Sequence, residues 1–171
     1  MPDQTPSGLL NLQLPLLQQA EAKTEASVPA AQKATYLRIL VAGMKVALNR
    51  GPAGLLGQLQ KSKTPLSDCV RGSVGIVGLL RRESSGTMPV PVMVPAGFSL
   101  VLHGLDFLQK MGVMQIDANA LATATHLYSE TVMAALKITP QKVQQLAAMA
   151  HSTMQDPQAM STLQAKMNGG Q

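Results

Sequence analysis

Apolar residues recur at helical spacing along most of this chain, and the pattern predicts an all-α protein. The run AAQKATYLRILVAGMKVALN at residues 30–49 is apolar around most of its circumference, and its polar residues keep to one narrow stripe. A helix with this pattern is typical of a bundle or an assembly, where neighbours cover it on several sides.

The segment from residue 88 to residue 112 changes character at Pro95. Three prolines predict an extended chain over 88–94, because proline lacks an amide hydrogen and restricts the residue before it. After Pro95 the sequence predicts an amphipathic helix that ends at Gly112. We expect its polar face to meet solvent; that face consists of Ser99, His103, Asp106 and Lys110.

Cap residues predict where other helices begin. A Thr or Asp directly before a proline supplies a cap oxygen and a first helical residue that needs no amide hydrogen. Thr64-Pro65, Thr139-Pro140 and Asp156-Pro157 predict helices near 65–82, 140–154 and 157–167, and Asp117 predicts one more. We therefore expect a bundle of five to seven helices, with an extended N-terminal arm over 1–29, a helical domain over 30–167 and a flexible tail at 168–171.

The predicted arm carries leucine at alternate positions, namely Leu10, Leu12, Leu14 and Leu16. A period of two is typical of extended chain. Two interpretations remain open at this point. The leucines are buried either on a partner subunit or on the chain's own domain.

Basic residues are concentrated in one segment of a chain whose formal net charge is +5. From Lys33 to Arg82 nine Lys or Arg residues accompany one acid, Asp68, whereas five basic residues and eight acids lie elsewhere. Such a segment predicts a polyanion as partner, either nucleic acid or an anionic membrane, although the same residues also suit an ordinary solvated face. The candidate residues are Arg38, Lys45, Arg50, Lys61, Lys63, Arg71, Arg81 and Arg82.

Glycine recurs at every third position in two stretches, GPAGLLG at 51–57 and GSVGIVGLL at 72–80. Neither stretch has the spacing of a phosphate-binding loop, so we do not expect nucleotide binding. On a helix, glycines at this spacing form a groove that lets another helix approach closely. We predict subunit contacts at Gly51, Gly54, Gly57, Gly72, Gly75 and Gly78.

A membrane contact is a further prediction. The stretch 72–80 is too short to span a bilayer, and residues 88–108 contain prolines, His103 and Asp106. Together they suit an interfacial or re-entrant hairpin. The residues predicted to meet a membrane or a neighbouring ring of subunits are Val92, Val94, Phe98, Val101, Leu102, Leu105 and Leu108.

Catalytic chemistry is not predicted. His103, His126 and His151 lie on different predicted helices, and none is at a metal-ligand spacing from another suitable side chain. The single cysteine, Cys69, lies among apolar residues and is expected to be buried. We therefore predict no catalytic residues, no metal ligands and no cofactor.

The order of several segments resembles that of small virion proteins of short-tailed bacteriophages, over about 35–160. The segments are ILVAGMKVALN, a Thr-Pro helix start, MPVPVMVPAG leading into VLHGLDFLQKMGV, LATATHLYSETVMAALKITPQKV, and MQDPQAM. The match lies in the overall composition of the segments, which predict helices rich in Gln, Ala and Met with few aromatic residues.

The resemblance implies a structural, homo-oligomeric virion protein, one of the internal proteins ejected ahead of the genome to form a conduit across the host envelope. Its implied partners are copies of itself, other virion proteins, the DNA backbone without sequence specificity, and membrane. Its implied location is the virion and, after ejection, the host envelope. Two alternatives stay open: a small basic DNA-binding accessory protein of the bacterial cytoplasm, and a peripheral bacterial membrane protein.

Overall fold

The computed structural model describes residues 11–48 and 54–137, together with residues 139, 141 and 144. The described residues form six α-helices and one short 3-10 helix and contain no strand. The elements are α1 (Pro15–Ala26), η2 (Ala30–Gln32), α2 (Lys33–Leu48), α3 (Leu55–Leu59), α4 (Pro65–Glu83), α5 (Val90–Lys110) and α6 (Ala118–Ala135). The prediction of an all-α bundle of five to seven helices is therefore confirmed.

The chain divides into two compact units, Met1–Val132 and Met133–Gln171. Nearly all described residues belong to the first unit. In the second unit the described residues are the end of α6 and a few residues after it, of which Gln141 and Gln144 are helical. The predicted helix 157–167 and tail 168–171, and most of the predicted helix 140–154, lie outside the described residues.

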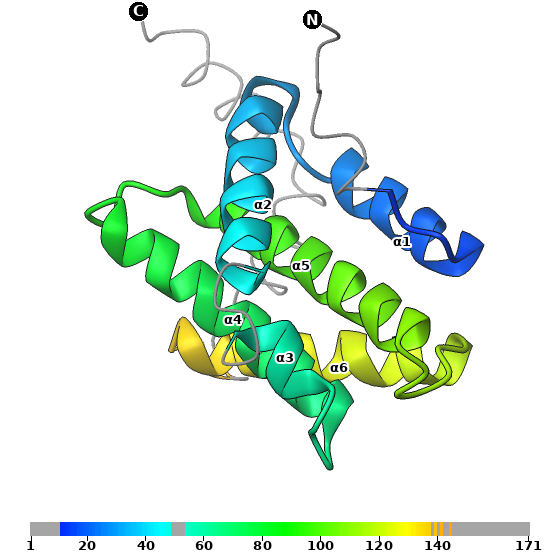
Figure 1. The fold of residues 1–171 in the computed structure, drawn as a ribbon. Coiled ribbons are helices and arrows are strands. Elements are labelled where there is room, and N and C mark those ends of the chain that lie inside the picture. Colours follow the sequence, from blue (N-terminus) through cyan, green and yellow to red (C-terminus); the bar gives the residue numbers. More distant parts are fainter. Residues whose placement is uncertain (1–10, 49–53, 138, 140, 142–143, 145–171) are drawn as a thin grey trace, which may run out of the picture. The chain divides into compact units, whose positions relative to one another are not determined.

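Helix α5 is the central helix of the first unit, and α1, α2 and α4 pack against it (Figure 1). Thirteen of its 21 residues are buried. Val101, Leu102 and Leu105 have no exposed surface and form the core with residues of α1, α4 and α6. Because apolar burial is the main favourable contribution to folding, α5 determines where the other helices lie.

The prediction of an extended chain over 88–94 is wrong from Val90 onward, since α5 begins there with Pro89 as its N-cap. Pro91 lies in the first helical turn, where an amide hydrogen has no partner within the helix. Pro95 removes one hydrogen bond, and burial of Val92 and Met93 compensates for it.

The prediction of an extended arm over 1–29 is wrong for residues 15–26, which form α1. Pro15 is the first helical residue, so this proline marks a helix start in the same way as Pro65 does. Leu12 and Leu17 are buried in the chain's own core. The structure thus favours the interpretation in which the leucines fold back; Leu10 lies outside the described residues.

Two predicted helix ends, the start at Asp117 and the end at Gly112, agree with the structure. An oxygen of the Asp117 side chain accepts the amide hydrogen of Ala120 at 2.8 Å and caps α6. Gly112 has a φ of +67° and closes α5 through hydrogen bonds typical of a glycine C-cap. Thr64 precedes α4 as predicted, but its hydroxyl makes no cap hydrogen bond and lies 3.3 Å from a carboxylate oxygen of Asp68.

Glycine allows α4 and α5 to approach each other closely at one position. A Cβ atom at Gly104 would lie 2.3 Å from the sulfur of Cys69, so no larger residue fits there without a shift. Cys69 is buried as predicted, and this burial raises the pKa of its thiol to about 12. The thiol is consequently a small apolar contact of the core.

Candidate functional site

The polar residues of α5 lie inside the protein. The prediction that Ser99, His103 and Asp106 meet solvent is wrong, since their exposed fractions are 0%, 7% and 4%. They are covered because both α1 and α2 pack against the central helix. Only Lys110, at the C-terminal end of α5, is exposed.

One part of this buried polar group links three helices. The hydroxyl of Tyr36, on α2, donates to a carboxylate oxygen of Glu21 on α1 at 3.0 Å and lies 2.7 Å from the hydroxyl of Ser99. Burial raises the pKa of Glu21 above its usual value, and the hydrogen bonds from Tyr36 and Ser99 oppose that shift. Burial also raises the pKa of Tyr36, so its hydroxyl keeps its proton.

A second part lies near the other end of α5. Asp106 forms an ion pair with Lys110 at 2.5 Å and accepts the backbone amide hydrogen of Gln13 at 3.1 Å. His103 is buried next to it, and its Nε2 atom has no hydrogen-bond partner. Burial lowers the pKa of His103 to about 4, while the charge of Asp106 raises it and that of Lys110 lowers it further. His103 is therefore neutral at pH 7.

These contacts hold residues 13–21 on α2 and α5, which is a structural role. Within the described part of the chain no three His, Cys, Asp or Glu side chains gather where they could hold a metal ion. The sequence analysis missed Glu21 and Tyr36. The signal that could have found them was the low charge of α5, which has only two charged residues. A helix of such low charge is central, and its buried polar residues need partners from neighbouring helices.

The residues predicted to contact a membrane or a neighbouring ring are in the core. Val92, Val101, Leu102, Leu105 and Leu108 have no exposed surface, and Val94 and Phe98 are half-buried. This prediction is corrected, because their partners are side chains of the same chain. By length and composition α5 is the one described helix that is apolar enough to cross a bilayer, but 67% of its most apolar window is buried in the protein.

The predicted cations lie on the surface. Arg38 and Lys45 are exposed on α2, Lys61 and Lys63 on the chain between α3 and α4, and Arg71 and Arg82 on α4; Arg81 is half-buried, and Arg50 lies outside the described residues. Ion pairs among the described residues involve Lys33, Lys110 and His126 and none of these cations. Their positive charge is therefore not neutralised within the described part of the chain.

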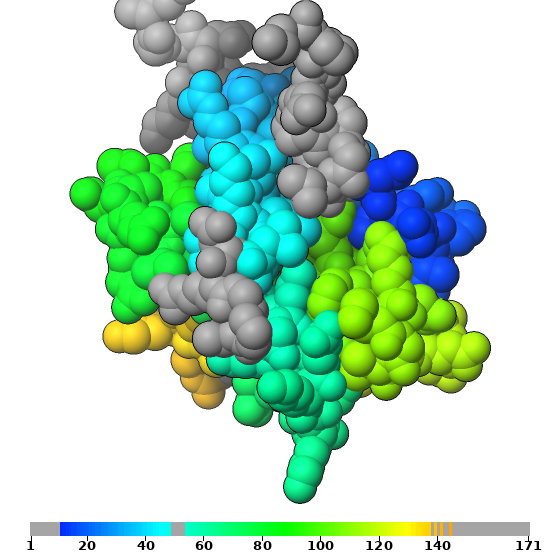
Figure 2. Space-filling view, viewed as in Figure 1, coloured from blue at the N-terminus to red at the C-terminus, as the bar shows by residue number. Residues whose placement is uncertain are grey.

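Helix α2 also exposes leucine. Leu37 and Leu48 each have an exposed fraction of 44%. At about 100° per residue, these two leucines, Arg38 and Lys45 fall within roughly 100° of the helix circumference. We call this sector the α2 face. It combines apolar and cationic side chains that are exposed, on a helix that lies at the surface of the molecule in Figure 2.

Comparisons with known proteins identify no relative of this chain. No family model matches the chain, and no curated protein or solved structure matches it.

The predicted glycine contacts have different environments. A Cβ atom at Gly72 would lie 2.2 Å from Leu55 of the same chain, so Gly72 serves packing within the unit. Gly75 and Gly78 are exposed, with no atom within 4 Å of a Cβ atom. Gly54 is the buried N-cap of α3, Gly57 is half-buried, and Gly51 lies outside the described residues. Subunit contact at Gly75 and Gly78 stays a prediction.

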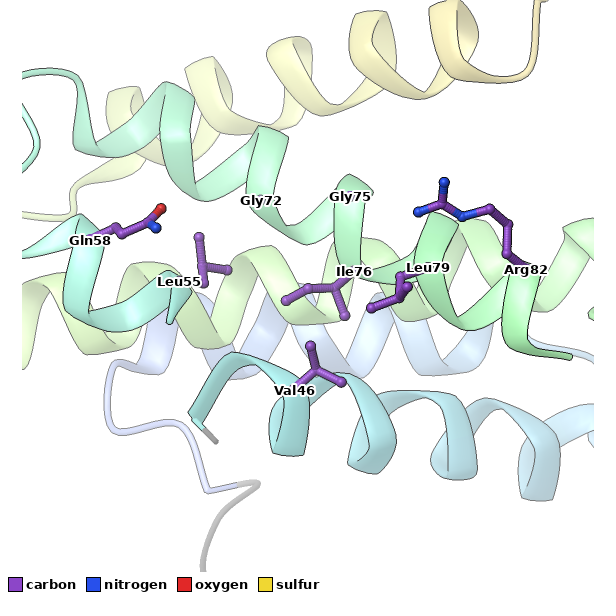
Figure 3. A pocket seen from close by; sticks show the side chains of 8 residues that line it. All are labelled: Val46, Leu55, Gln58, Gly72, Gly75, Ile76, Leu79 and Arg82. Carbon is purple, nitrogen blue, oxygen red and sulfur yellow. The ribbon is translucent and has the colours of Figure 1, made fainter. Parts of the chain in front are cut away.

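An open groove of about 380 Å³ lies between α2, α3 and α4. Its lining consists of Val46, Leu55, Gln58, Gly72, Gly75, Ile76, Leu79 and Arg82. Figure 3 shows Gln58 and Arg82 at opposite ends, with the aliphatic side chains between them. We call it the α4 groove. Other hollows border the α2 face and include Arg38, Lys45 and Lys61 in their linings.

Proposed function

We propose that this chain is a structural protein that binds the surface of an anionic membrane through the α2 face. The proposal rests on one observation, the presence of Leu37 and Leu48 beside Arg38 and Lys45 on one exposed sector of α2. A lipid surface accepts both kinds of side chain, because leucine enters the acyl boundary and the cations meet anionic headgroups.

The leucines favour a membrane over DNA. Phosphate groups of DNA attract Arg and Lys, but they offer no apolar surface to the two leucines beside the cations. The cations also disfavour pairing of the α2 faces of two copies, because like charges repel at close range. A bilayer with acidic headgroups satisfies both components of this face.

This function is compatible with the role that the resemblance to phage virion proteins implies. An internal protein that leaves the virion and enters the host envelope must contact lipid, and peripheral binding by α2 provides that contact without exposing the core helix α5. Assembly with copies of the chain and with other virion proteins belongs to the same proposal.

Vesicle flotation tests the membrane proposal. We expect binding to vesicles that contain phosphatidylglycerol, little binding to pure phosphatidylcholine vesicles, and weaker binding at high salt. The double variants Leu37→Gln/Leu48→Gln and Arg38→Gln/Lys45→Gln should each reduce binding by tenfold or more, at about 1 kcal/mol per cation. The matched controls are Met111→Gln, an exposed apolar residue, and Lys23→Gln, an exposed cation.

Duplex DNA is the competing ligand in the same experiment. If both leucine substitutions left vesicle binding unchanged while the cation substitutions abolished binding to DNA, a DNA-binding function would replace the membrane function. For assembly, mass photometry of the wild type should reveal particles larger than a dimer, and particles of only one or two chains would contradict this part of the proposal.

A further inference from the structure

The α4 groove is an elongated apolar slot with a cation at one end. From Gly72 to Arg82 it follows ten residues of α4, or roughly 15 Å at the rise of an α-helix. Val46, Leu55, Ile76 and Leu79 supply its apolar lining. Its volume falls within the range of clefts that hold small ligands, roughly 300–1,000 Å³.

The charge at its end is available to a ligand. Arg82 is exposed and forms no ion pair with a described residue. A guanidinium group at the end of an apolar slot matches an amphiphile with a negative head and a hydrocarbon chain, because the planar group holds phosphate or carboxylate with two hydrogen bonds.

Helix α2 contributes to both the groove and the surface that would carry the lipid. Val46 lines the groove, and the preceding residue, Lys45, belongs to the α2 face. We infer that the α4 groove binds one acyl chain of an anionic phospholipid whose phosphate lies on Arg82. This inference deepens the proposed membrane function and depends on it for the source of the lipid.

Gly75 provides a direct test. A Cβ atom there meets no atom within 4 Å, so a leucine fits the fold and occupies the groove. Gly78 is one turn further along, is equally open and does not line the groove. Gly75→Leu and Gly78→Leu therefore change helix propensity alike, and only the first fills the slot.

The ligand used is dihexanoyl phosphatidylglycerol below its micellar concentration, with dihexanoyl phosphatidylcholine for comparison. Methyl NMR of the wild type should give saturable shifts at Ile76 and Leu79 with the anionic lipid. Gly75→Leu should weaken binding by about tenfold, since displacing two methylene groups already has that effect. Gly78→Leu should bind as the wild type does, and Arg82→Gln should lose the preference for the anionic lipid.

Equal lipid affinity in Gly75→Leu and the wild type would overturn the inference. So would groove shifts that appear without lipid as protein concentration rises, because a second copy would then be the occupant. Vesicle flotation separates the two proposals: substitutions at Leu37 and Leu48 test the α2 face, whereas Gly75→Leu should reduce binding of the soluble lipid even if vesicle binding persists.

Discussion

Helices α2 and α5 carry similar patterns and have opposite environments. Each is rich in aliphatic residues and has polar residues on one side, Arg38 and Lys45 in α2 and Ser99, His103 and Asp106 in α5. In α2 the polar side is exposed together with two leucines, whereas in α5 it is buried against α1 and α2. Periodicity thus identifies the faces of a helix but not which of them meets water.

The difference follows from the position of each helix. Helix α5 packs against α1, α2, α3 and α4, so most of its polar groups are buried and need partners within the protein. Tyr36, which is hydrogen-bonded to Glu21, also hydrogen-bonds with Ser99. Asp106 pairs with Lys110 and accepts the backbone amide hydrogen of Gln13. Arg38 and Lys45 of α2 are exposed and form no ion pair with a described residue, so they remain hydrated.

The largest expected effect on stability comes from comparing a leucine of α5 with a leucine of α2. Leu102→Ala in α5 should lower the free energy of unfolding by about 2–5 kcal/mol, because the residue is fully buried and leaves a cavity. Leu37→Ala in α2 should change it by less than about 0.5 kcal/mol, because that side chain is nearly half exposed. Urea unfolding followed by circular dichroism measures both. Similar losses in the two variants would contradict the assignment of the α2 face to solvent.

Much of the fold was predictable from local signals, because helix ends depend on single residues. Pro65, Asp117 and Gly112 each placed a helix end within the sequence. The failures came from residues whose effect depends on tertiary packing. Pro95 is tolerated inside α5 because neighbouring side chains are buried there, and α1 begins at Pro15 although the leucines that lead into it alternate.

The candidate site was predictable only in part. The surface position of Arg38 and Lys45 followed from their charge, since an unpaired cation is rarely buried. The sequence could not place the α4 groove, because it joins residues of α2, α3 and α4 that are far apart in the chain. Nor could it separate Gly72, which packs on Leu55, from the open Gly75, because the spacing is the same.

A second test compares two histidines. The folded protein holds His103 neutral down to a pKa of about 4, whereas the unfolded chain takes up the proton near 6.5. Stability should therefore be unaffected above pH 6.5 and should fall between pH 6.5 and 4, by roughly 3 kcal/mol at most. His103→Gln should reduce that loss. His126→Gln should leave it unchanged, because His126 is exposed beside Glu130; a pH profile of urea unfolding distinguishes the two.

The smallest expected effect separates the buried carboxylate of α5 from an exposed cation of α2. Asp106→Ala removes the partner of Lys110 and of the Gln13 amide, and it should lower the free energy of unfolding by about 1–3 kcal/mol. The value should lie near the lower end, because Lys110 is partly exposed and water replaces its partner. Lys45→Ala should cost less than about 0.5 kcal/mol.

Asp106→Asn divides the loss between its two causes. The amide keeps an oxygen that accepts the Gln13 hydrogen, while the ion pair with Lys110 is removed. If the amide hydrogen of Gln13 anchors the chain before α1, hydrogen exchange at residues 13–20 should accelerate in Asp106→Ala and much less in Asp106→Asn. Equal acceleration in both variants would assign the anchoring to charge, and the hydrogen bond to Gln13 would then be incidental to the position of α1.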